Sequence, residues 1–152
     1  MKSLNIITPV KDSIDSTLET VKAIMASNIS VHHTYTIYND FSTPENTRRL
    51  EEASKKYGFR LVNLSDLTTH PSPNYLLVLQ RVQAECIEQN AGMLIVESDV
   101  IVEPHTLQAL YEGALERKDC AIAAGVTVND DGAINYPYEY ARGKEKDRKS
   151  VV

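Results

Sequence analysis

The sequence contains little glycine and cysteine and no long apolar run. Among its 152 residues are six glycines and two cysteines, and neither a Gly-x-Gly-x-x-Gly segment nor a glycine-rich lysine loop for phosphate is present. Any bound phosphate would therefore have to be held by side chains or by a metal. Cys86 and Cys120 lie among apolar residues without Cys-x-x-Cys or Cys/His spacing. This pattern excludes a zinc site and predicts buried free thiols in a reducing compartment.

The lack of long apolar runs argues against a membrane-spanning segment. No stretch approaches the roughly 20 apolar residues that span a bilayer, and the N-terminal run at residues 4–7 is too short for a signal peptide. We therefore expect a cytoplasmic protein, with peripheral contact at the inner face of the membrane as its closest approach to lipid.

The charge distribution disfavours nucleic acid as the main partner. The formal net charge is -5, and residues 142–149 alone hold five basic and two acidic side chains, so the rest of the chain carries about -8. A body this acidic repels a polyanion, although a nucleotide bound together with its metal is still compatible. We expect one domain over residues 1–140 and a charged, poorly ordered tail over residues 141–152.

The chain alternates short runs rich in β-branched residues with segments of helical period. Strands are predicted at residues 4–8, 35–38, 59–64, 93–96 and 121–128. Helices are predicted between them, at residues 14–25, 43–58, 74–90 and from about 104 onward. This alternation predicts an α/β fold, with a mainly parallel sheet, helices on both faces and right-handed crossovers in a Rossmann-like arrangement.

Several of these helices have recognisable limits and apolar stripes. Thr43, Pro44 and Gly58 predict the start and the end of the second helix, because proline is favoured in the first turn and glycine just past the last. The apolar stripes of the first, third and fourth helices are expected at Ile14, Leu18, Val21 and Met25, at Tyr75, Leu79, Val82 and Cys86, and at Leu107, Leu110, Tyr111 and Ala114.

Acidic residues collect just after the predicted strands, which is where ligands bind to parallel sheets. Glu97 and Asp99 follow an apolar strand that ends at Val96. Alternate residues of an extended segment point the same way, so both carboxylates could face one ligand. Their hard oxygen atoms suit Mg²⁺ or Mn²⁺. The pair alone is a weak indication, because the N-terminus of a following helix also attracts carboxylates.

Three segments of the chain, in the right order, resemble the motifs of family 2 glycosyltransferases. The segments are Ile6-Ile7-Thr8-Pro9-Val10, Tyr38-Asn39-Asp40-Phe41-Ser42-Thr43, and the run from Leu94 to Leu107 around Glu97-Ser98-Asp99. The resemblance implies the A-type nucleotide-diphospho-sugar transferase fold. It also implies a UDP-, GDP- or dTDP-linked sugar donor, a Mn²⁺ or Mg²⁺ cofactor, and inverting transfer to a sugar or lipid-linked acceptor.

Carried over by position, the resemblance implies roles for individual residues. Asp40 would accept a hydrogen bond from the nucleotide base, and the backbone at Pro9, Val10 and Lys11 would line the base and ribose. Arg81 stands on the third helix where the family often has an Arg-Asn pair. It could donate to the diphosphate, or it could be an ordinary arginine on a helix surface.

The acidic triplet is the implied metal site. Asp99 would bind the metal that bridges the diphosphate, and Glu97 would approach the ribose or a metal-bound water. In the second and third motifs, two residues depart from the family pattern. Asn39 stands where the first acid of the second motif is usual, and Glu97 replaces an aspartate. The additional methylene puts the direct contact of Glu97 in question more than that of Asp99.

Sugar transfer also needs a general base for the acceptor hydroxyl, and no residue can be assigned to it from the sequence. In enzymes of this type the base lies well downstream of the acidic triplet. Asp130 and Asp131 belong to an Asn-Asp-Asp-Gly segment, which is a turn signal. Two interpretations stay open: the donor-binding part of a glycosyltransferase whose acceptor half is missing, or a non-catalytic α/β nucleotide-binding or regulatory module.

Overall fold

The structure is a computed structural model that describes residues 1–116, 119–120, 122–129 and 132–134. The tail predicted at residues 141–152 lies outside these residues, as do Asp130 and Asp131. The elements in chain order are β1 (Ser3–Val10), α1 (Ile14–Met25), β2 (His33–Asn39), α2 (Pro44–Tyr57), β3 (Arg60–Asn63), the 3₁₀ helix η1 (Leu64–Asp66), α3 (Tyr75–Gln89), β4 (Ala91–Ile95) and α4 (Thr106–Glu116).

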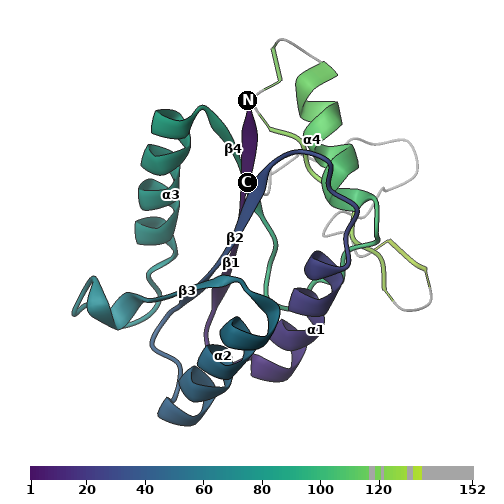
Figure 1. The fold of residues 1–152 in the computed structure, drawn as a ribbon. Coiled ribbons are helices and arrows are strands. Elements are labelled where there is room, and N and C mark those ends of the chain that lie inside the picture. Colours follow the sequence, from purple (N-terminus) through teal and green to yellow (C-terminus); the bar gives the residue numbers. More distant parts are fainter. Residues whose placement is uncertain (117–118, 121, 130–131, 135–152) are drawn as a thin grey trace, which may run out of the picture.

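The four strands form one parallel sheet in the order β3-β2-β1-β4 (Figure 1). Ile6 in β1 lies opposite Tyr35 in β2 and Leu94 in β4. The chain builds outward from β1 to β3 and then crosses back to place β4 on the other side of β1. The strand order therefore reverses at β1, and the carboxyl ends of β1 and β4 flank the crevice where such sheets bind ligands.

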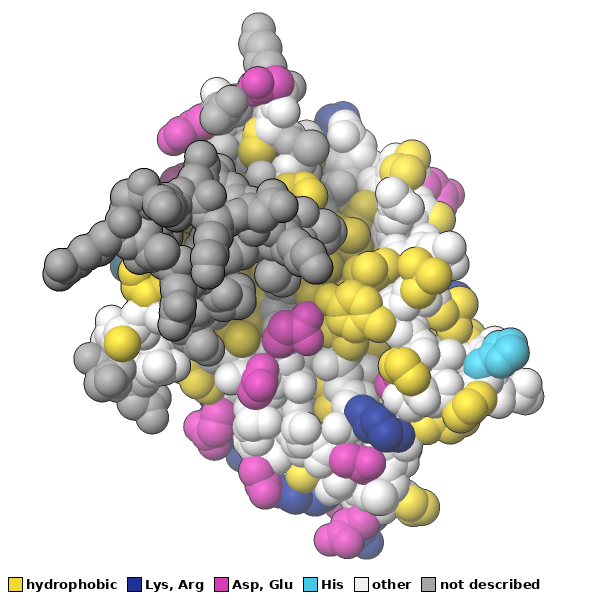
Figure 2. Space-filling view, turned by 180° about the vertical axis from the view of Figure 1, so that it is seen from behind, with side chains coloured by type: hydrophobic (Ala, Val, Ile, Leu, Met, Phe, Trp, Pro, Cys, Tyr) yellow, Lys and Arg dark blue, Asp and Glu magenta, His cyan; other side chains and the backbone are white. Residues whose placement is uncertain are grey.

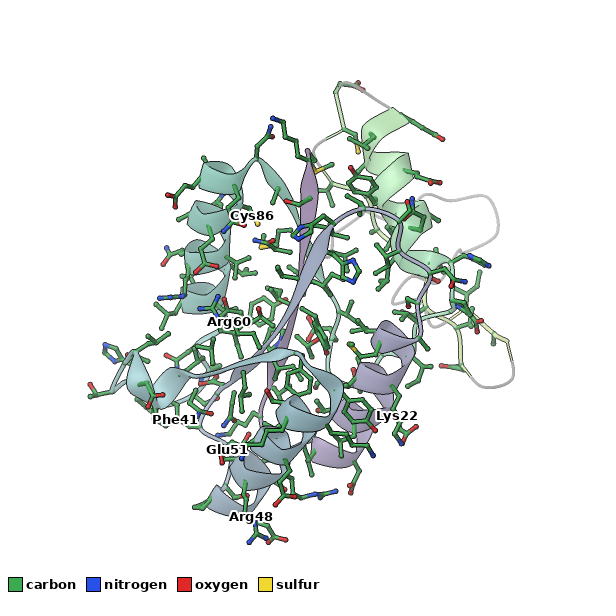
Figure 3. The ribbon with its side chains drawn as sticks, in the orientation of Figure 1. Lys22, Phe41, Arg48, Glu51, Arg60 and Cys86 are labelled. Atoms are coloured by element: carbon green, nitrogen blue, oxygen red, sulfur yellow. The ribbon has the colours of Figure 1, made fainter. Side chains whose placement is uncertain are left out.

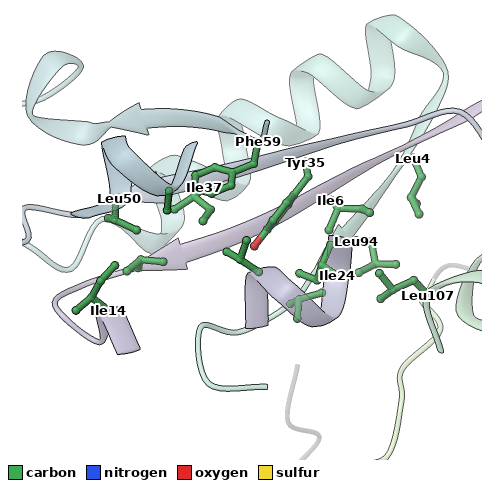
Figure 4. Close-up of a cluster of buried hydrophobic side chains, with 14 residues drawn as sticks. Leu4, Ile6, Ile14, Ile24, Tyr35, Ile37, Leu50, Phe59, Leu94 and Leu107 are labelled. Atoms are coloured by element: carbon green, nitrogen blue, oxygen red, sulfur yellow. The ribbon is translucent and has the colours of Figure 1, made fainter. Parts of the chain in front are cut away.

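Helices cover both faces of the sheet, as the sequence predicts. Helices α1, α2 and α4 pack on one face and α3 packs on the other (Figure 1). Successive side chains of a strand point to opposite faces, so Ile6 belongs to the first of these apolar clusters and its neighbour Ile7 to the second. In the first cluster the rings of Tyr35 and Phe59 are neighbours, and their centroids are 5.8 Å apart (Figure 4).

The predicted limits of α2 are confirmed. Thr43 is its N-cap, and the threonine hydroxyl accepts a hydrogen bond from the backbone N–H of Asn46 at 3.3 Å. Pro44 is the first helical residue, and Gly58 ends the helix with a left-handed φ of 82°. A glycine adopts this conformation without the steric cost that a side chain would bring.

The apolar stripe predicted for α1 is rotated in the structure. Ile24 is buried while Met25 is 48% exposed, and the buried face includes Thr17 and Thr20. The two threonine hydroxyls donate to backbone carbonyl groups four residues earlier, at 2.6 and 3.2 Å. These bonds satisfy the hydroxyls within the helix. The buried face of α1 can therefore include two polar residues, which a pattern of apolar residues does not predict.

The stripe predicted for α3 also needs correction. Val78 is buried beside Val82 and Cys86, whereas Tyr75 is 37% exposed. Cys86 is a buried free thiol, as predicted, on the side of α3 that faces the sheet (Figure 3). Cys120 is free but only half-buried.

The fifth strand predicted at residues 121–128 is wrong for the described part of that range. Residues 122–127 form no strand, and only Val128 makes an isolated antiparallel bridge, to Ile134. The N–H of Gly132 donates to the carbonyl of Asn129 at 2.8 Å. A β-branched run becomes a strand only where a neighbouring strand pairs with it. Across the described residues, β4 pairs with β1 alone.

None of the helices in the described ranges is long and apolar enough to cross a membrane. On the face shown in Figure 2, apolar side chains gather in the middle, with acidic side chains below them. Met93 and Ile95 of β4 are among the exposed apolar residues of the chain. Strand β4 lies at one edge of the described sheet.

Candidate functional site

The carboxyl ends of β1, β2 and β4, together with the segment before α3, enclose a hollow of about 260 Å³. It lies at the reversal of strand order, as expected for a ligand site in such a sheet. Of the residues predicted from the sequence, the structure brings together Pro9, Val10, Lys11, Asp40 and Glu97 around this hollow. Ser72, Asn74 and Tyr75, which sequence reasoning did not select for the site, line it as well.

A second hollow, of about 470 Å³, lies at the other end of the sheet. It extends past the start of β3, beside Thr34, Thr36 and Gln89. Although it is larger, none of the site residues predicted from the sequence lines it. The smaller hollow is therefore the candidate functional site.

Asp40 connects the end of β2 to the segment before α3. The residue is 8% exposed, and its carboxylate accepts three hydrogen bonds, each 2.8 Å long, from the Ser72 hydroxyl, the Asn74 backbone N–H and the Asn74 side-chain amide. Burial raises the pKa of Asp40, but the bonds from Asn74 and Ser72 and the charge of Lys11 outweigh it, so the pKa lies below its ordinary value. The carboxylate is thus ionised at neutral pH and holds one wall of the hollow.

Asn39, which departs from the family pattern, has a structural role next to Asp40. It is buried, and its side-chain amide donates to the Thr47 hydroxyl at 3.0 Å and to the Asn63 side-chain oxygen at 2.9 Å. Its own oxygen accepts from the backbone N–H of Ser42 at 3.2 Å. An ionised aspartate cannot donate these two bonds. The asparagine therefore fits this position because it joins β2, α2 and β3.

The loops that follow β1 and β2 are tied together through Asp12. This residue has a left-handed φ of 57°, and its carboxylate accepts from the backbone N–H of Thr43 at 2.6 Å and from the Asn46 amide at 3.2 Å. The bond from Thr43 is the main cause that lowers the pKa of Asp12. Lys11 donates to the carbonyl of Phe41 at 3.2 Å, so the predicted base-lining segment is anchored to the loop that carries Asp40.

Glu97 and Asp99 do not lie on an extended segment, contrary to the sequence-based expectation. Strand β4 ends at Ile95, and residues 97–100 form a turn that the N–H of Val100 closes by donating to the Glu97 carbonyl at 3.2 Å. Alternation along a strand therefore does not govern the directions of these two side chains. Both residues are exposed, and of the two only Glu97 lines the hollow.

Tyr75 is the neighbour of Glu97 across the hollow. Its hydroxyl donates to Oε1 of Glu97 at 3.0 Å. Burial and the acceptor carboxylate together raise the pKa of Tyr75 to about 12, so the phenol keeps its proton at neutral pH. Helical periodicity placed Tyr75 among buried residues. Its position in the first turn after Pro71-Ser72-Pro73 was a local signal for a residue near the strand ends.

Arg81 is not brought to the hollow. It lies further along α3 and forms an ion pair with Glu85, four residues away, at 3.3 Å. Pairs at this spacing are common on exposed helix surfaces and stabilise them slightly. The proposed contact of Arg81 with a diphosphate stays a prediction.

The described residues contain no cluster of three or more His, Cys, Asp or Glu side chains that could hold a metal by themselves. Mg²⁺ commonly uses one or two carboxylates and completes its shell with water and substrate phosphate oxygens. The exposed carboxylates of Glu97 and Asp99 fit that mode of binding by their donor type. A cation at this turn would therefore depend on the ligand for part of its coordination.

No protein-family model and no curated protein sequence matches the chain. Solved structures match at the level of the fold. S. aureus TarS 1–349 in complex with UDP-GlcNAc is 18% identical with a TM-score of 0.54, and the match covers 76% of this chain and 32% of that one. Glucosyl-3-phosphoglycerate synthase from Mycobacterium tuberculosis, in complex with UDP, is 17% identical with a TM-score of 0.53, covering 77% and 41%.

These matches define the class of fold. The chain has the Rossmann-like α/β fold of A-type glycosyltransferases, as the sequence motifs predict. It spans about a third of the length of the TarS 1–349 structures that it matches. At such low identity the likeness concerns the fold, and the chemistry has to be argued from the side chains of this chain.

Proposed function

We propose that the chain is the nucleotide-sugar-binding part of a glycosyltransferase of the family 2 type. One observation carries the proposal: residues selected from three separate motifs meet at one hollow, at the carboxyl ends of β1, β2 and β4. The A-type glycosyltransferase fold supports it. Because three of the matched structures contain UDP or UDP-GlcNAc, a UDP-linked sugar is the first donor to test, ahead of GDP- and dTDP-linked sugars.

Asp40 would read the nucleotide base through its less occupied oxygen. Within the described residues, Oδ2 accepts from both the Ser72 hydroxyl and the Asn74 backbone, whereas Oδ1 accepts from the Asn74 amide. A carboxylate oxygen has two lone pairs, so Oδ1 has capacity for a base N–H. The backbone of Pro9, Val10 and Lys11, which also lines the hollow, would line the base and ribose.

The acidic turn would bind the diphosphate end of the donor. Asp99, exposed at the turn, is the proposed carboxylate ligand of Mn²⁺ or Mg²⁺, and Glu97 is a second candidate ligand at the rim of the hollow. A bound cation would neutralise the diphosphate and stabilise its departure. In our proposal the chain supplies the carboxylates and the hollow, while the donor supplies the remaining oxygen ligands.

Transfer would proceed with inversion to a sugar or lipid-linked acceptor, and it would require a general base. We assign no described residue to that step. A non-catalytic nucleotide-binding or regulatory module would share the donor site but would not release nucleoside diphosphate in the presence of acceptors. Acceptor-dependent release, measured with a panel of sugar and lipid-linked acceptors, would exclude the non-catalytic module.

Isothermal titration calorimetry tests donor binding directly. We expect the full chain to bind one of the UDP-, GDP- and dTDP-linked sugars in preference to the others, and to bind it more tightly with Mn²⁺ than without. CDP-linked sugars are the matched control, because cytosine lacks the ring N–H that Asp40 would accept. If no nucleotide sugar bound, with or without Mn²⁺, the proposed function would be wrong.

A further inference from the structure

Two connections place Tyr75 at the hollow. Asn74 is the N-cap of α3, and Asp40 holds it through its backbone N–H and its side-chain amide, both at 2.8 Å. Tyr75 follows as the first residue of the helix, so the end of β2 determines where its ring begins. From there its hydroxyl reaches Oε1 of Glu97, after β4, at 3.0 Å. A continuous set of contacts thus links β2 to β4 across the hollow.

The hydrogen bond from Tyr75 restricts the Glu97 side chain, which would otherwise be free to move. Glu97 is exposed, it follows β4, and its longer side chain has more rotamers than the aspartate usual at this position in the family that the sequence resembles. A binding group that moves freely loses conformational entropy when a ligand arrives, whereas a group already held loses less. The tyrosine hydroxyl holds one carboxylate oxygen of Glu97 and leaves Oε2 for another donor.

We propose that Tyr75 is a positioning residue of the donor site: it holds the Glu97 carboxylate at the rim so that Oε2 accepts a hydroxyl of the donor ribose. This inference rests on the proposed function and adds a residue and a division of labour to it. Glu97 serves the ribose, and Asp99 remains as the carboxylate for the cation. The additional methylene of glutamate is what lets this side chain meet the tyrosine and the hollow at once.

The substitution Tyr75→Phe tests the contact, because it removes the hydroxyl and keeps the ring. We expect the affinity of the full chain for UDP, without Mn²⁺, to fall roughly 3- to 10-fold, within the range for the net contribution of one ordinary hydrogen bond. Tyr111→Phe is the matched control. It removes a hydroxyl on α4 that donates to the carbonyl of Met1 at 3.4 Å, away from the hollow, and should leave affinity unchanged. Thermal unfolding should have the same midpoint in both variants.

A double-mutant cycle separates positioning from direct contact. In the Glu97→Ala background, Tyr75→Phe should cause no further loss of UDP affinity, because its effect acts through Glu97. An equal loss in both backgrounds would mean that Tyr75 touches the ligand itself, and would overturn the inference. The enhancement by Mn²⁺ should persist in Tyr75→Phe.

The two proposals fail in different ways. If the unmodified chain bound neither UDP nor another nucleoside diphosphate, the proposed function would fail and this inference with it. If the unmodified chain bound UDP and Tyr75→Phe bound it equally well, the donor site would stand and the positioning role of Tyr75 would be wrong.

Discussion

Asp40 and Asn74 are joined by two hydrogen bonds of 2.8 Å, one from the backbone N–H of Asn74 and one from its side-chain amide. Both residues are 8% exposed. Asp40 directly follows β2 and Asn74 is the N-cap of α3, so the pair joins these two elements at one side of the hollow.

Asn74→Ala should destabilise the fold. The substitution removes the amide that donates to Oδ1 of Asp40 and leaves a nearly buried carboxylate short of one partner. We expect the free energy of unfolding to fall by about 1 to 3 kcal/mol, measured by urea denaturation at pH 7. Asn28→Ala, at an exposed asparagine, is the control and should change stability by less than about 0.5 kcal/mol. Equal effects would contradict the role of the pair.

The stabilisation from Asp40 should disappear in acid. Its pKa in the folded protein lies below the ordinary value of 3.8, because the hydrogen bonds from Asn74 and Ser72 outweigh burial. A depressed folded pKa contributes stability that is fully present above pH 3.8 and is lost as the pH falls through the folded value. The difference in unfolding free energy between the unmodified chain and Asp40→Asn should therefore shrink below pH 3.8.

Asp12 also has a lowered pKa, but it is present in both proteins of this comparison, so its titration cancels from the difference. Denaturation curves at several pH values between 2 and 7 give the measurement. A difference that stayed constant over this range would show that the Asp40 carboxylate does not stabilise the fold through its charge.

Asp99→Asn should weaken donor binding only when the cation is present. It keeps the size of the side chain but removes a charged oxygen ligand. Affinity for the preferred nucleotide sugar in Mn²⁺ should fall at least about tenfold, or about 1.4 kcal/mol, while binding without Mn²⁺ changes little. Glu88→Gln, which removes an exposed charge on α3, controls for the change in net charge. Unchanged affinity of Asp99→Asn in Mn²⁺ would remove Asp99 from the metal site.

Asp40→Ala should reduce discrimination between bases. The ratio of UDP to CDP affinity is the informative quantity, because partial unfolding of the variant would lower both apparent affinities by the same factor. Loss of the base N–H contact should reduce the preference for UDP by on the order of 1 to 3 kcal/mol. A ratio equal to that of the unmodified chain would show that Asp40 supports the fold without reading the base.

Local signals in the sequence were enough to predict the α/β fold and its parallel sheet. Thr43, Pro44 and Gly58 bound α2 as predicted, because capping depends on residues within one turn of each other. Residues at strand ends were found for the same reason: a β-branched run followed by a polar residue marks the carboxyl end of a strand. Parallel pairing then brings these ends to one edge, which is how Lys11, Asp40 and Glu97 come to line one hollow.

Features that need a distant partner were not predictable in this way. The fifth strand was expected from composition alone, but a strand also requires a neighbouring strand to pair with. Residues 122–127 form no strand. Thr17 and Thr20 are buried in α1 because their hydroxyls are satisfied within the helix, which an apolar pattern does not register. Residues 97–100 form a turn, closed by the hydrogen bond from the N–H of Val100 to the carbonyl of Glu97, where an extended segment was expected.

The sequence by itself determined the order of strands and helices and which residues stand at strand ends, because both follow from contacts between near neighbours in the chain. Only the tertiary structure decided how the site is held together. Asn74 holds Asp40, and Tyr75 holds Glu97, across separations of 34 and 22 residues. Such pairs depend on where the crossover from β3 to β4 places the start of α3, and no local pattern specifies that position.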